Sequence, residues 1–463
     1  MAGTAGSEGF QPIGQPDETD QPGGSPMLSV TDLRDAAADT DLDAVVPRAE
    51  VDVSSTVSAV LPIIEQVRAG GASAVLELGE RFDGVRAPAL RVPAEAIEQA
   101  LQTLAPEVRA ALEESIRRAR KVHAAQVPSG TEVELADGAI VENRWVPVDR
   151  VGLYVPGGRA VYPSSVVMNV VPAQAAGVQG LAVASPPQRE HGGLPHPTVL
   201  AACALLGVDE VYAAGGAQAV AMLALGVKDD DGTQVCAPVA MVTGPGNVYV
   251  AAAKRALLGR IGVDAEAGPS EIAVIADGTA QAAWVAADLI SQSEHDPLAA
   301  SVLITDSEEL VRDVLAEVER QAPRLPLAEQ IRTALTGPQS GVLLVRDMDH
   351  AVQVADAYAA EHLEVHTRNP EQVARRVTHA GAIFVGPHAP VPLGDYSAGS
   401  NHVLPTSGTA RFSSGLNTVT FLRLQQLIRY DAQGLEELID GVSALAHDEG
   451  LEGHGAAMRI RRS

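Results

Sequence analysis

A repeating pattern from Val151 onward most constrains the fold of this chain: a short apolar strand, a loop rich in Gly and Pro, and then a helix. The first four strands run into loops at 156–158, 185–187, 215–218 and 244–247. Apolar strands that alternate with helices predict a parallel sheet covered by helices on both faces. Glycines at strand ends let the backbone approach a ligand, but they also serve tight turns, and no strict GxGxxG motif is present.

A second set of the same kind follows the first. Strands are expected at 272–275, 301–304, 341–345 and 382–385, and helices at 279–294, 307–321 and 349–361. Residues 29–150 are expected to be mainly helical, with helices within 57–81 and 95–127 and strands or a hairpin within 132–150. A long irregular loop is expected at 394–415 and a helical tail at 422–463. The predicted class is α/β, with two Rossmann-like parallel-sheet domains, a small N-terminal segment and a helical C-terminal tail.

Composition limits the possible partners. Aromatic residues make up only 3% of a chain that is 46% hydrophobic, so Ala, Val and Leu must fill the cores. The net charge of −26 argues against nucleic-acid binding, which needs a basic face. Cys203 and Cys236 form no CxxC motif, which suits a reducing cytoplasm, and both are expected to be structural.

The N-terminus and the uncharged stretch 160–188 bear on where the protein is expected in the cell. Residues 1–26 are rich in Gly, Pro, Ser and acids and are predicted to be a disordered extension, so that Met27 is a plausible alternative start. No secretory signal is visible. Residues 160–188 contain no charge, but polar residues and Pro172 interrupt them. They therefore predict a buried helix followed by a buried strand, and no membrane span.

Residues 288–297 look like the end of a helix and carry the first candidate ligands. Gln292 and His295 are three residues apart, so both side chains leave one face of the helix. An imidazole and a carbonyl oxygen on one face make half of a metal site, and imidazole suits zinc. A solvated helix end gives the same pattern, so the prediction depends on partners elsewhere in the chain.

Asp395 and His454 are the candidate partners for a zinc site. Zinc catalysis needs mixed ligands and one open face, and only the fold can unite segments so far apart in the chain. Asp395 lies in the predicted irregular loop, where Asp also commonly caps turns. His454 also fits an exposed histidine of the tail.

Glu361 and His362 are the candidate acid–base pair. They are expected to end the helix that starts near Asp349, where a solvated helix end would also favour a histidine. An adjacent carboxylate and imidazole can share proton transfer, because histidine titrates near neutral pH. His366 is expected to be structural. The remaining histidines are expected at the surface, namely His123, His191, His196, His350, His379, His388 and His447.

Ten motifs in one order resemble the histidinol dehydrogenase family over roughly residues 27–463. They are LYVPGG (153–158), GGAQ (215–218), GPGN (244–247), AGPSE (267–271), SQSEH (291–295), EHL (361–363), GDY (394–396), NHVLPT (401–406), EGL (449–451) and His454. One such motif is a weak signal, but the ordered set is very specific. The resemblance implies a zinc enzyme that oxidises L-histidinol through L-histidinal to L-histidine and reduces two NAD+ in turn.

The resemblance also implies roles for individual residues. By the family pattern, His362 takes the alcohol proton and Glu361 activates the water that hydrates the aldehyde. One Zn2+ per subunit is held by Gln292, His295, Asp395 and His454. Substrate is bound by Ser270, Gln292, His295, His362, Asp395, His402, Glu449 and His454. The NAD+ site is lined by Tyr154, Gln218 and Asn247.

The family pattern further implies a homodimer whose tail completes the partner's site, so that Glu449 and His454 act in trans. The implied domains are a helical segment at 27–52, a discontinuous α/β domain at 53–153 and 270–416 with zinc and catalytic residues, an inserted α/β NAD-binding domain at 154–269, and a helical dimerisation tail at 417–463.

Three other functions fit part of the pattern. A related zinc and NAD dehydrogenase could use the same scaffold on another small alcohol, although Glu449 and His454 suit a substrate with an imidazole. A zinc hydrolase would use Glu361 as general base, but it leaves the glycine loops without a role. A non-catalytic binding protein does not explain why Glu361 and His362 accompany the candidate ligands.

Overall fold

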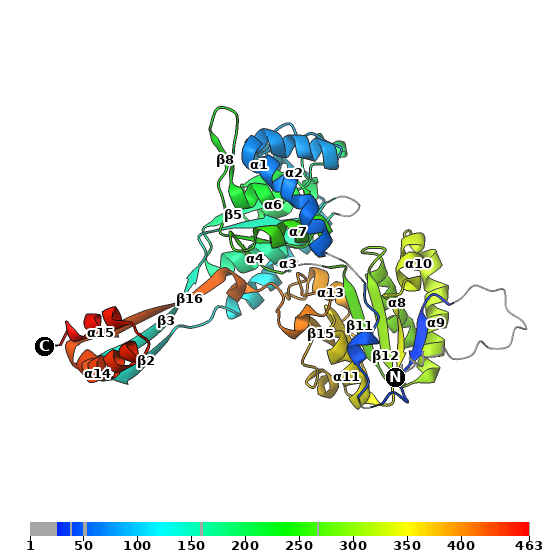
Figure 1. The fold of residues 1–463 in the computed structure, drawn as a ribbon. Helices are drawn as coiled ribbons and strands as arrows, with labels where there is room; N and C mark the ends of the chain where they lie inside the picture. The colour runs from blue at the N-terminus through cyan, green and yellow to red at the C-terminus, as the bar shows by residue number, and fades with distance from the viewer. Residues whose placement is uncertain (1–25, 38, 50–52, 158–160, 266–267, 463) are drawn as a thin grey trace, which may run out of the picture.

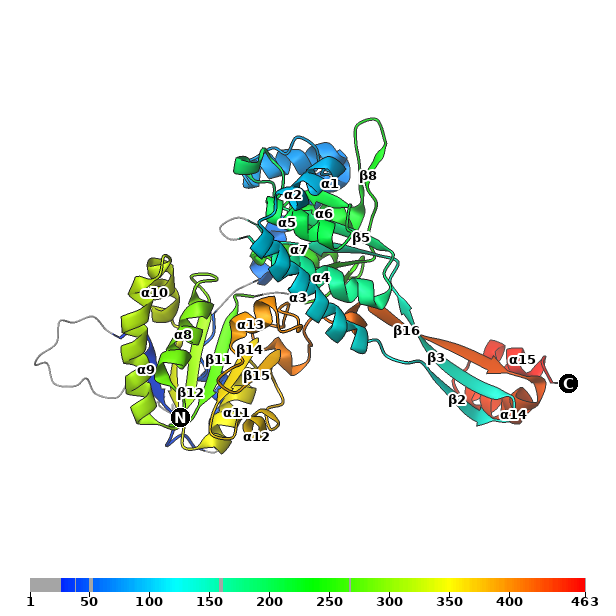
Figure 2. The same cartoon turned by 180° about the vertical axis from the view of Figure 1, so that it is seen from behind.

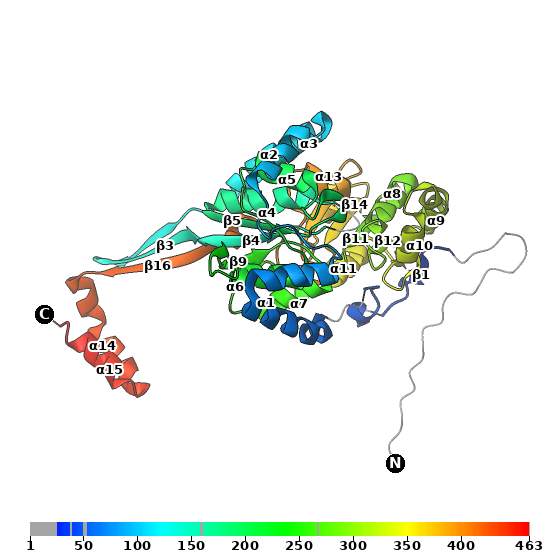
Figure 3. The ribbon, with the colours of Figure 1, turned by 90° about the horizontal axis from the view of Figure 1, so that it is seen from above.

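The computed structural model describes residues 26–37, 39–49, 53–157, 161–265 and 268–462. Two α/β bodies lie side by side, and a narrow arm extends away from them (Figures 1, 2 and 3). The predicted extension over 1–26 lies outside the described residues except for Pro26. Met27 and Leu28 are buried in a core, so residues at the start of the predicted globular part belong to it.

One body is built on a six-stranded sheet in which every neighbouring pair is parallel. In spatial order its strands are β1 (Ser29–Asp32), β13 (Gly341–Leu344), β12 (Ala300–Thr305), β11 (Glu271–Ala276), β14 (His362–His366) and β15 (Ala382–Val385). The chain goes from β11 through β12 to β13 and then returns to the other side of β11. The direction of winding therefore reverses between β11 and β14.

Helices cover both faces of this sheet, as the apolar strands require. One face packs against α8 (Ala282–Ser293), α9 (Glu308–Gln321) and α10 (Ala328–Thr336), and the other against α11 (Met348–Tyr358) and α12 (Pro370–Ala374). In β11, Ile272 and Val274 join the α8 side, while Ala273 and Ile275 join the α11 side. This alternation is the period of two expected of a strand that is buried on both faces.

The other body is built on a five-stranded parallel sheet. Its strands in spatial order are β10 (Gly262–Val263), β9 (Met241–Thr243), β4 (Arg150–Tyr154), β5 (Gly180–Ser185) and β6 (Val211–Ala213). One face packs against α2 (Ala94–Thr103), α3 (Pro106–Ala125), α4 (Pro163–Ala176) and α5 (Pro197–Leu205). The other face packs against α1 (Val53–Phe82), α6 (Gly216–Leu225) and α7 (Val248–Leu257).

The uncharged stretch 160–188 is internal, as predicted. It contains α4, in which eleven of the residues are buried, and then β5, which pairs with β4 and β6. The chain also has one helix, α1, that is long and apolar enough to cross a membrane by length and composition. This helix packs along α6 and α7 and is interrupted at Gly71, where φ is 57° and ψ is −139°. It is therefore a kinked helix of the domain core.

The arm is a three-stranded antiparallel sheet that carries two helices at its far end (Figure 3). It consists of β2 (Thr131–Ala136), β3 (Ala139–Pro147), β16 (Leu422–Tyr430), α14 (Ala432–Asp448) and α15 (Glu452–Arg459). The hairpin expected within 132–150 is confirmed as β2 and β3. The wholly helical tail is wrong, because residues 422–430 pair with β3 over their full length. Apolar residues alternate in this stretch, which is the period of a strand.

The remaining short elements are the hairpin strands β7 (Val227–Lys228) and β8 (Gln234–Cys236), the helix α13 (Val391–Tyr396), and 3-10 turns η1 (Leu42–Ala44), η2 (Arg189–His191), η3 (Ala322–Arg324), η4 (Thr409–Arg411) and η5 (Thr418–Phe421). Two of them correct expectations. The segment expected to be helical over 27–52 contains β1 and only the turn η1, because β1 adds to the edge of the six-stranded sheet through β13. The expected irregular loop at 394–415 begins inside α13.

The helix expected over 349–361 ends at Tyr358, and Ala359 caps it in the left-handed region with φ 49°. Glu361 and His362 therefore do not end a helix: His362 opens β14, a strand between β11 and β15. The helices of 53–127 also differ from the expected domain division. They pack on the five-stranded sheet through α4, α5, α6 and α7, and not on the sheet of 270–416.

Two histidines expected at the surface are buried. His123 is fully enclosed, and its Nδ1 lies 2.8 Å from the Gln126 Oε1 atom. His350 is 4% exposed and lies 3.4 Å from the Arg346 backbone N–H. Both lie on the packed face of a helix, where the ring fills core volume.

The GPGN loop after β9 is fixed by a buried ion pair. Lys254 Nζ donates to the Gly244 carbonyl oxygen and to Asp264 Oδ1, each at 2.6 Å, and Asp264 Oδ2 accepts from the Gly244 N–H at 2.8 Å. Gly244 has φ 113°, and a Cβ there would lie 2.0 Å from the Tyr154 carbonyl oxygen. The loop thus needs glycine and is held in place by both members of the pair.

We expect Lys254→Met to lower the free energy of unfolding by about 3–5 kcal/mol, because it leaves Asp264 buried without its partner. Urea denaturation followed by circular dichroism measures this change. Lys121→Met, which removes an exposed lysine from α3, is the matched control and should change stability little. Equal losses in the two variants would contradict a structural role for the buried pair.

Candidate active site

Glu361 is a buried carboxylate held by the first residues of β11. Its Oε2 atom accepts from the Ser270 hydroxyl at 2.6 Å and from the Glu271 backbone N–H at 2.9 Å. A buried carboxylate is stable only when it is hydrogen-bonded, and both donors lie at the amino end of the six-stranded sheet. Since β11 and β14 are neighbours in this sheet, the fold sets Glu361 and the following His362 at the same edge.

His362 has a defined tautomer. Its Nδ1 lies 3.1 Å from the carbonyl oxygen of Glu271, which can only accept, so Nδ1 carries the proton. Nε2 therefore presents a lone pair, and among the described residues this buried atom has no hydrogen-bond partner. A buried imidazole with a free lone pair can accept a proton from a bound alcohol.

Gln292 is linked to Glu361 through one hydroxyl group. Gln292 Nε2 donates to the Ser270 Oγ atom at 2.7 Å, and Ser270 in turn donates to Glu361. The amide nitrogen is thereby assigned, and Oε1 of Gln292 is buried with no hydrogen-bond partner in the described part of the chain. His295 lies two residues past the end of α8 and is exposed. An unpaired amide oxygen and an open imidazole suit a metal such as zinc.

Asp395 and His402 reach the same region from α13 and the loop after it. His402 Nδ1 donates to the Asp395 carbonyl oxygen at 3.0 Å, and its Nε2 accepts from the Ser165 hydroxyl of α4 at 3.1 Å. Burial lowers the pKa of His402, Asp395 opposes this shift, and His362 and His295 add to it. His402 is therefore neutral at neutral pH, and its two hydrogen bonds tie the loop after α13 to Asp395 and to α4.

The contact between His402 and α4 joins the two bodies. Asn401 Nδ2 also donates to the Met168 carbonyl oxygen of α4 at 2.7 Å, and Ser115 of α3 donates to the Tyr396 carbonyl oxygen at 2.5 Å. Ser165 lies in the first turns of α4, the helix that follows β4. The amino ends of β11 and β14 therefore face the carboxyl ends of the five-stranded sheet.

The residues expected to line NAD+ lie at those carboxyl ends. Tyr154 ends β4, Gln218 lies in the first turn of α6, and Asn247 caps α7. The winding of the sheet reverses between β4 and β9, the position at which parallel α/β sheets bind dinucleotides. At the loop after β6, a Cβ on Gly215 would lie 2.9 Å from Pro186. Glycine allows close approach of the backbone in the loops after β6 and β9, and this fits the binding of a dinucleotide at these loops.

Each of these three side chains also has a local partner. The Tyr154 hydroxyl oxygen accepts from the Gly216 N–H at 3.1 Å, and burial raises the pKa of Tyr154 to about 12. Gln218 Nε2 donates to Asp83 Oδ2 at 3.3 Å. Asn247 Oδ1 accepts from the backbone of Tyr249 and Val250 and so caps α7. The side chains therefore shape the loops in addition to any contact with a cofactor.

Glu449 and His454 are not brought to this region within one chain. Glu449 is the C-cap of α14, and His454 lies in α15. Both helices sit at the far end of the arm, well away from α8 and α13 (Figures 1 and 2). Within one chain, His454 therefore lies apart from α8 and α13, the elements next to which the other three expected zinc ligands lie.

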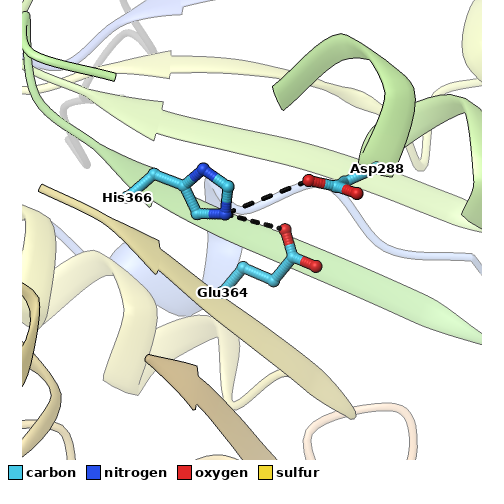
Figure 4. Close-up of side chains that lie close together, drawn as sticks. All are labelled: Asp288, Glu364 and His366. Atoms are coloured by element: carbon cyan, nitrogen blue, oxygen red, sulfur yellow. Dashed lines mark ion pairs between the residues drawn. The ribbon is translucent and has the colours of Figure 1, made fainter. Parts of the chain in front are cut away.

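The sequence analysis missed three buried carboxylates near this site, Glu271, Asp288 and Glu364, and expected His366 only to be structural. Burial and the charge of Glu361 raise the pKa of Glu271 to about 8, although Arg48 lies 3.9 Å from its carboxylate. Asp288, Glu364 and His366 form a second buried group on α8 and β14 (Figure 4). The signal for β14 was present in the alternation of polar and apolar residues over 362–366, which has the period of a strand.

Both cysteines are buried and unpaired, as expected for structural residues. Burial raises the pKa of the Cys203 thiol to about 12 and also raises that of Cys236. A cysteine nucleophile needs an accessible thiolate. Neither thiol meets this condition.

Two parallel sheets, with a buried Glu–His pair at the edge of one and glycine loops at the edge of the other, are an arrangement that suits an α/β oxidoreductase. The family model described as histidinol dehydrogenase matches residues 46–462. A curated histidinol dehydrogenase of Thermobifida fusca is 61% identical over 94% of this chain and 98% of its own length. That of Corynebacterium glutamicum is 58% identical over 94% of this chain and 98% of its own length.

A crystal structure of histidinol dehydrogenase from Elizabethkingia anophelis superimposes with a TM-score of 0.88. It is 29% identical, and the match covers 95% of this chain and 99% of that one. The chain belongs to the histidinol dehydrogenase family, which uses NAD and zinc. It is an oxidoreductase with histidinol dehydrogenase activity in histidine biosynthesis.

Proposed function

We propose that Glu361 and His362 carry out the proton transfers in the NAD-dependent oxidation of L-histidinol through L-histidinal to L-histidine. The hydrogen-bonded chain from Gln292 through Ser270 to Glu361 carries this proposal, because it couples a candidate metal ligand to a candidate base. When bound, zinc holds and polarises the substrate, and NAD+ accepts hydride from the oxidised carbon.

The unpaired lone pair of His362 Nε2 takes the alcohol proton. Glu361 takes a proton from the water that adds to the aldehyde, so that a hydrated carbon is available for the second oxidation. The two bases are adjacent in the chain, and Glu361 Oε2 lies 3.5 Å from His362 Nδ1, so each can act while the other stays in place. Ser270 and His402 bind and orient the substrate on either side of this pair.

Gln292, His295 and Asp395 are the zinc ligands that one chain supplies. The buried unpaired Oε1 of Gln292 supports this assignment, because such an atom is costly unless a ligand satisfies it. Oxygen and imidazole donors form a set that zinc accepts. Tyr154, Gln218 and Asn247 line the NAD+ site at the facing sheet, and the enzyme works in the cytoplasm.

The fourth ligand, His454, and the substrate-binding Glu449 come from the arm of a second subunit in a homodimer. The arm supports this proposal because it exposes large apolar side chains that a monomer has no reason to leave in water. They lie on the sheet and on both helices and include Leu135, Leu424, Ile428, Leu445 and Ile460. An arm that cannot reach its own site can complete that of a partner.

Zinc removal tests the reaction and its metal together. We expect the zinc-loaded enzyme to form two NADH per L-histidinol consumed, because both oxidations occur at one site. Chelation should abolish both steps, and added zinc should restore them. Formation of one NADH, or turnover of a plain diol at the same rate, would instead indicate a dehydrogenase for another small alcohol, and NAD-independent turnover would indicate a hydrolase.

Glu361→Gln should slow the aldehyde step by about 10²-fold or more and the alcohol step much less, since only the former needs an activated water. Gln keeps an oxygen that can accept from Ser270 and Glu271, so the fold should persist. Rapid-mixing measurements that start from L-histidinol or from L-histidinal separate the steps. His362→Asn is the counterpart, with the alcohol step impaired and zinc retained. Equal loss at both steps in Glu361→Gln would remove its assigned role.

Mixing inactive variants tests the exchange of arms. His454→Ala and His362→Asn should each be inactive alone. After dissociation and reassociation together they should recover about one quarter of wild-type activity, because half of the dimers are mixed and each has one intact site. The matched control is His362→Asn with Asp395→Ala, whose changes fall in the same body and cannot complement. No recovery in the first mixture would place His454 in the site of its own chain.

A further inference from the structure

Strand β14 presents a row of polar side chains to α8. His362, Glu364 and His366 alternate with Leu363 and Val365, and the two apolar residues join the core on the α11 side. The polar side chains thus share the other face, beside Ile272, Val274 and Ala276 of β11, which pack against α8. All three are buried, and Glu364 is fully enclosed. Polar groups in such a place need partners.

Asp288 of α8 closes this row into a cluster (Figure 4). His366 Nε2 lies 3.4 Å from Glu364 Oε2 and 3.9 Å from Asp288 Oδ2. Burial, followed by the charge of Glu364 and a hydrogen bond with it, raises the pKa of Asp288 to about 8. At neutral pH Asp288 therefore keeps its proton and can donate it to the Glu364 carboxylate.

The other carboxylate oxygen of Glu364, Oε1, is hydrogen-bonded to α13. Oε1 accepts from the backbone N–H of Val391, the first residue of α13, at 2.7 Å. Asp395 lies one turn further along this six-residue helix. A charged acceptor on a backbone N–H makes a strong hydrogen bond, so the position of Glu364 determines where α13 begins.

Asp288 links the Glu364 carboxylate to α8, which carries Gln292. It lies four residues before Gln292 on α8, so the two side chains leave the same face of that helix. Glu364 itself lies two residues after His362 on one face of β14. The Glu364 carboxylate is therefore hydrogen-bonded to α13, which carries Asp395, and lies within 4.8 Å of Asp288 on α8, which carries Gln292.

We propose that Glu364, supported by Asp288 and His366, is a positioning residue that sets α8 and α13 at the spacing required for zinc to bind Gln292 and Asp395. This inference rests on the ligands proposed above. Groups behind metal ligands orient them, and their loss commonly weakens metal binding by 10–100-fold. Glu364 and His366 follow His362 along the same face of β14.

The cluster itself is not assigned as a second metal site. Its three candidate ligand atoms lie within 4.8 Å of one another. However, one Glu364 oxygen is already bonded to α13, and a protonated Asp288 leaves a single carboxylate charge in the cluster. The bond to α13 gives the Glu364 carboxylate a structural partner, and metal analysis can check directly that no cation is bound beside it.

Two substitutions at one position separate the backbone bond from simple packing. Glu364→Gln keeps an oxygen for the Val391 N–H, whereas Glu364→Leu removes it. We expect zinc affinity, measured by chelator competition on the full-length enzyme, to fall about 10–100-fold in Glu364→Leu and only a few-fold in Glu364→Gln. The absorption spectrum of the Co2+-loaded enzyme should change in Glu364→Leu, because the ligand geometry changes.

Leu200→Ala is the control for lost stability, since it opens a cavity in the core of the five-stranded sheet, and its zinc affinity and Co2+ spectrum should match wild type. Wild-type affinity and spectrum in Glu364→Leu would overturn the proposal. So would a second zinc per subunit that Glu364→Leu abolishes. Asp395→Ala separates the positioning role from the ligand assignment. If Asp395→Ala loses zinc while Glu364→Leu keeps zinc, only the positioning role of Glu364 is wrong. If Asp395→Ala keeps zinc, the ligand assignment is wrong, and the positioning role is wrong with it.

Discussion

The active-site region depends on one buried carboxylate. Glu361 is removed from water, and among the described residues the cost is met by the Ser270 hydroxyl, just before β11, and by the N–H of Glu271, its first residue. This requirement fixes the register between β11 and β14, and His362 follows directly as the first residue of β14. Ser270 also accepts a hydrogen bond from Gln292 of α8, so the hydrogen bonds around one buried carboxylate connect α8, β11 and β14.

The two sheets contribute opposite ends to the region between them. Parallel strands leave their carboxyl ends open to a dinucleotide, and the glycine loops after β4, β6 and β9 occupy that edge in the five-stranded sheet. The six-stranded sheet instead offers its amino ends, where α8 ends and Glu361 is held. The contacts of Asn401 and His402 with α4 hold these two edges together.

The accuracy of the sequence analysis depended on how polar each strand is. The strands β5, β11 and β12 are continuous apolar runs, and their positions were predicted almost to the residue. Strand β14 was mistaken for the end of a helix because His362, Glu364 and His366 break its apolar run. Strand β16 was mistaken for a helix because its partner β3 lies far away in the chain. Local pattern carries no information about such a partner.

The sequence by itself determined the alternation of strands and helices, the glycine loops and the family, because each is a local pattern or an ordered set of short motifs. Only the tertiary structure decided which polar residues meet. It hydrogen-bonded Glu361 to the start of β11, left His362 Nε2 without a hydrogen-bond partner among the described residues, and joined Asp288, Glu364 and His366 into one cluster. It also put the arm out of reach of its own site. These outcomes follow from the pairing of distant strands and the burial of charge, which depend on neighbours in space.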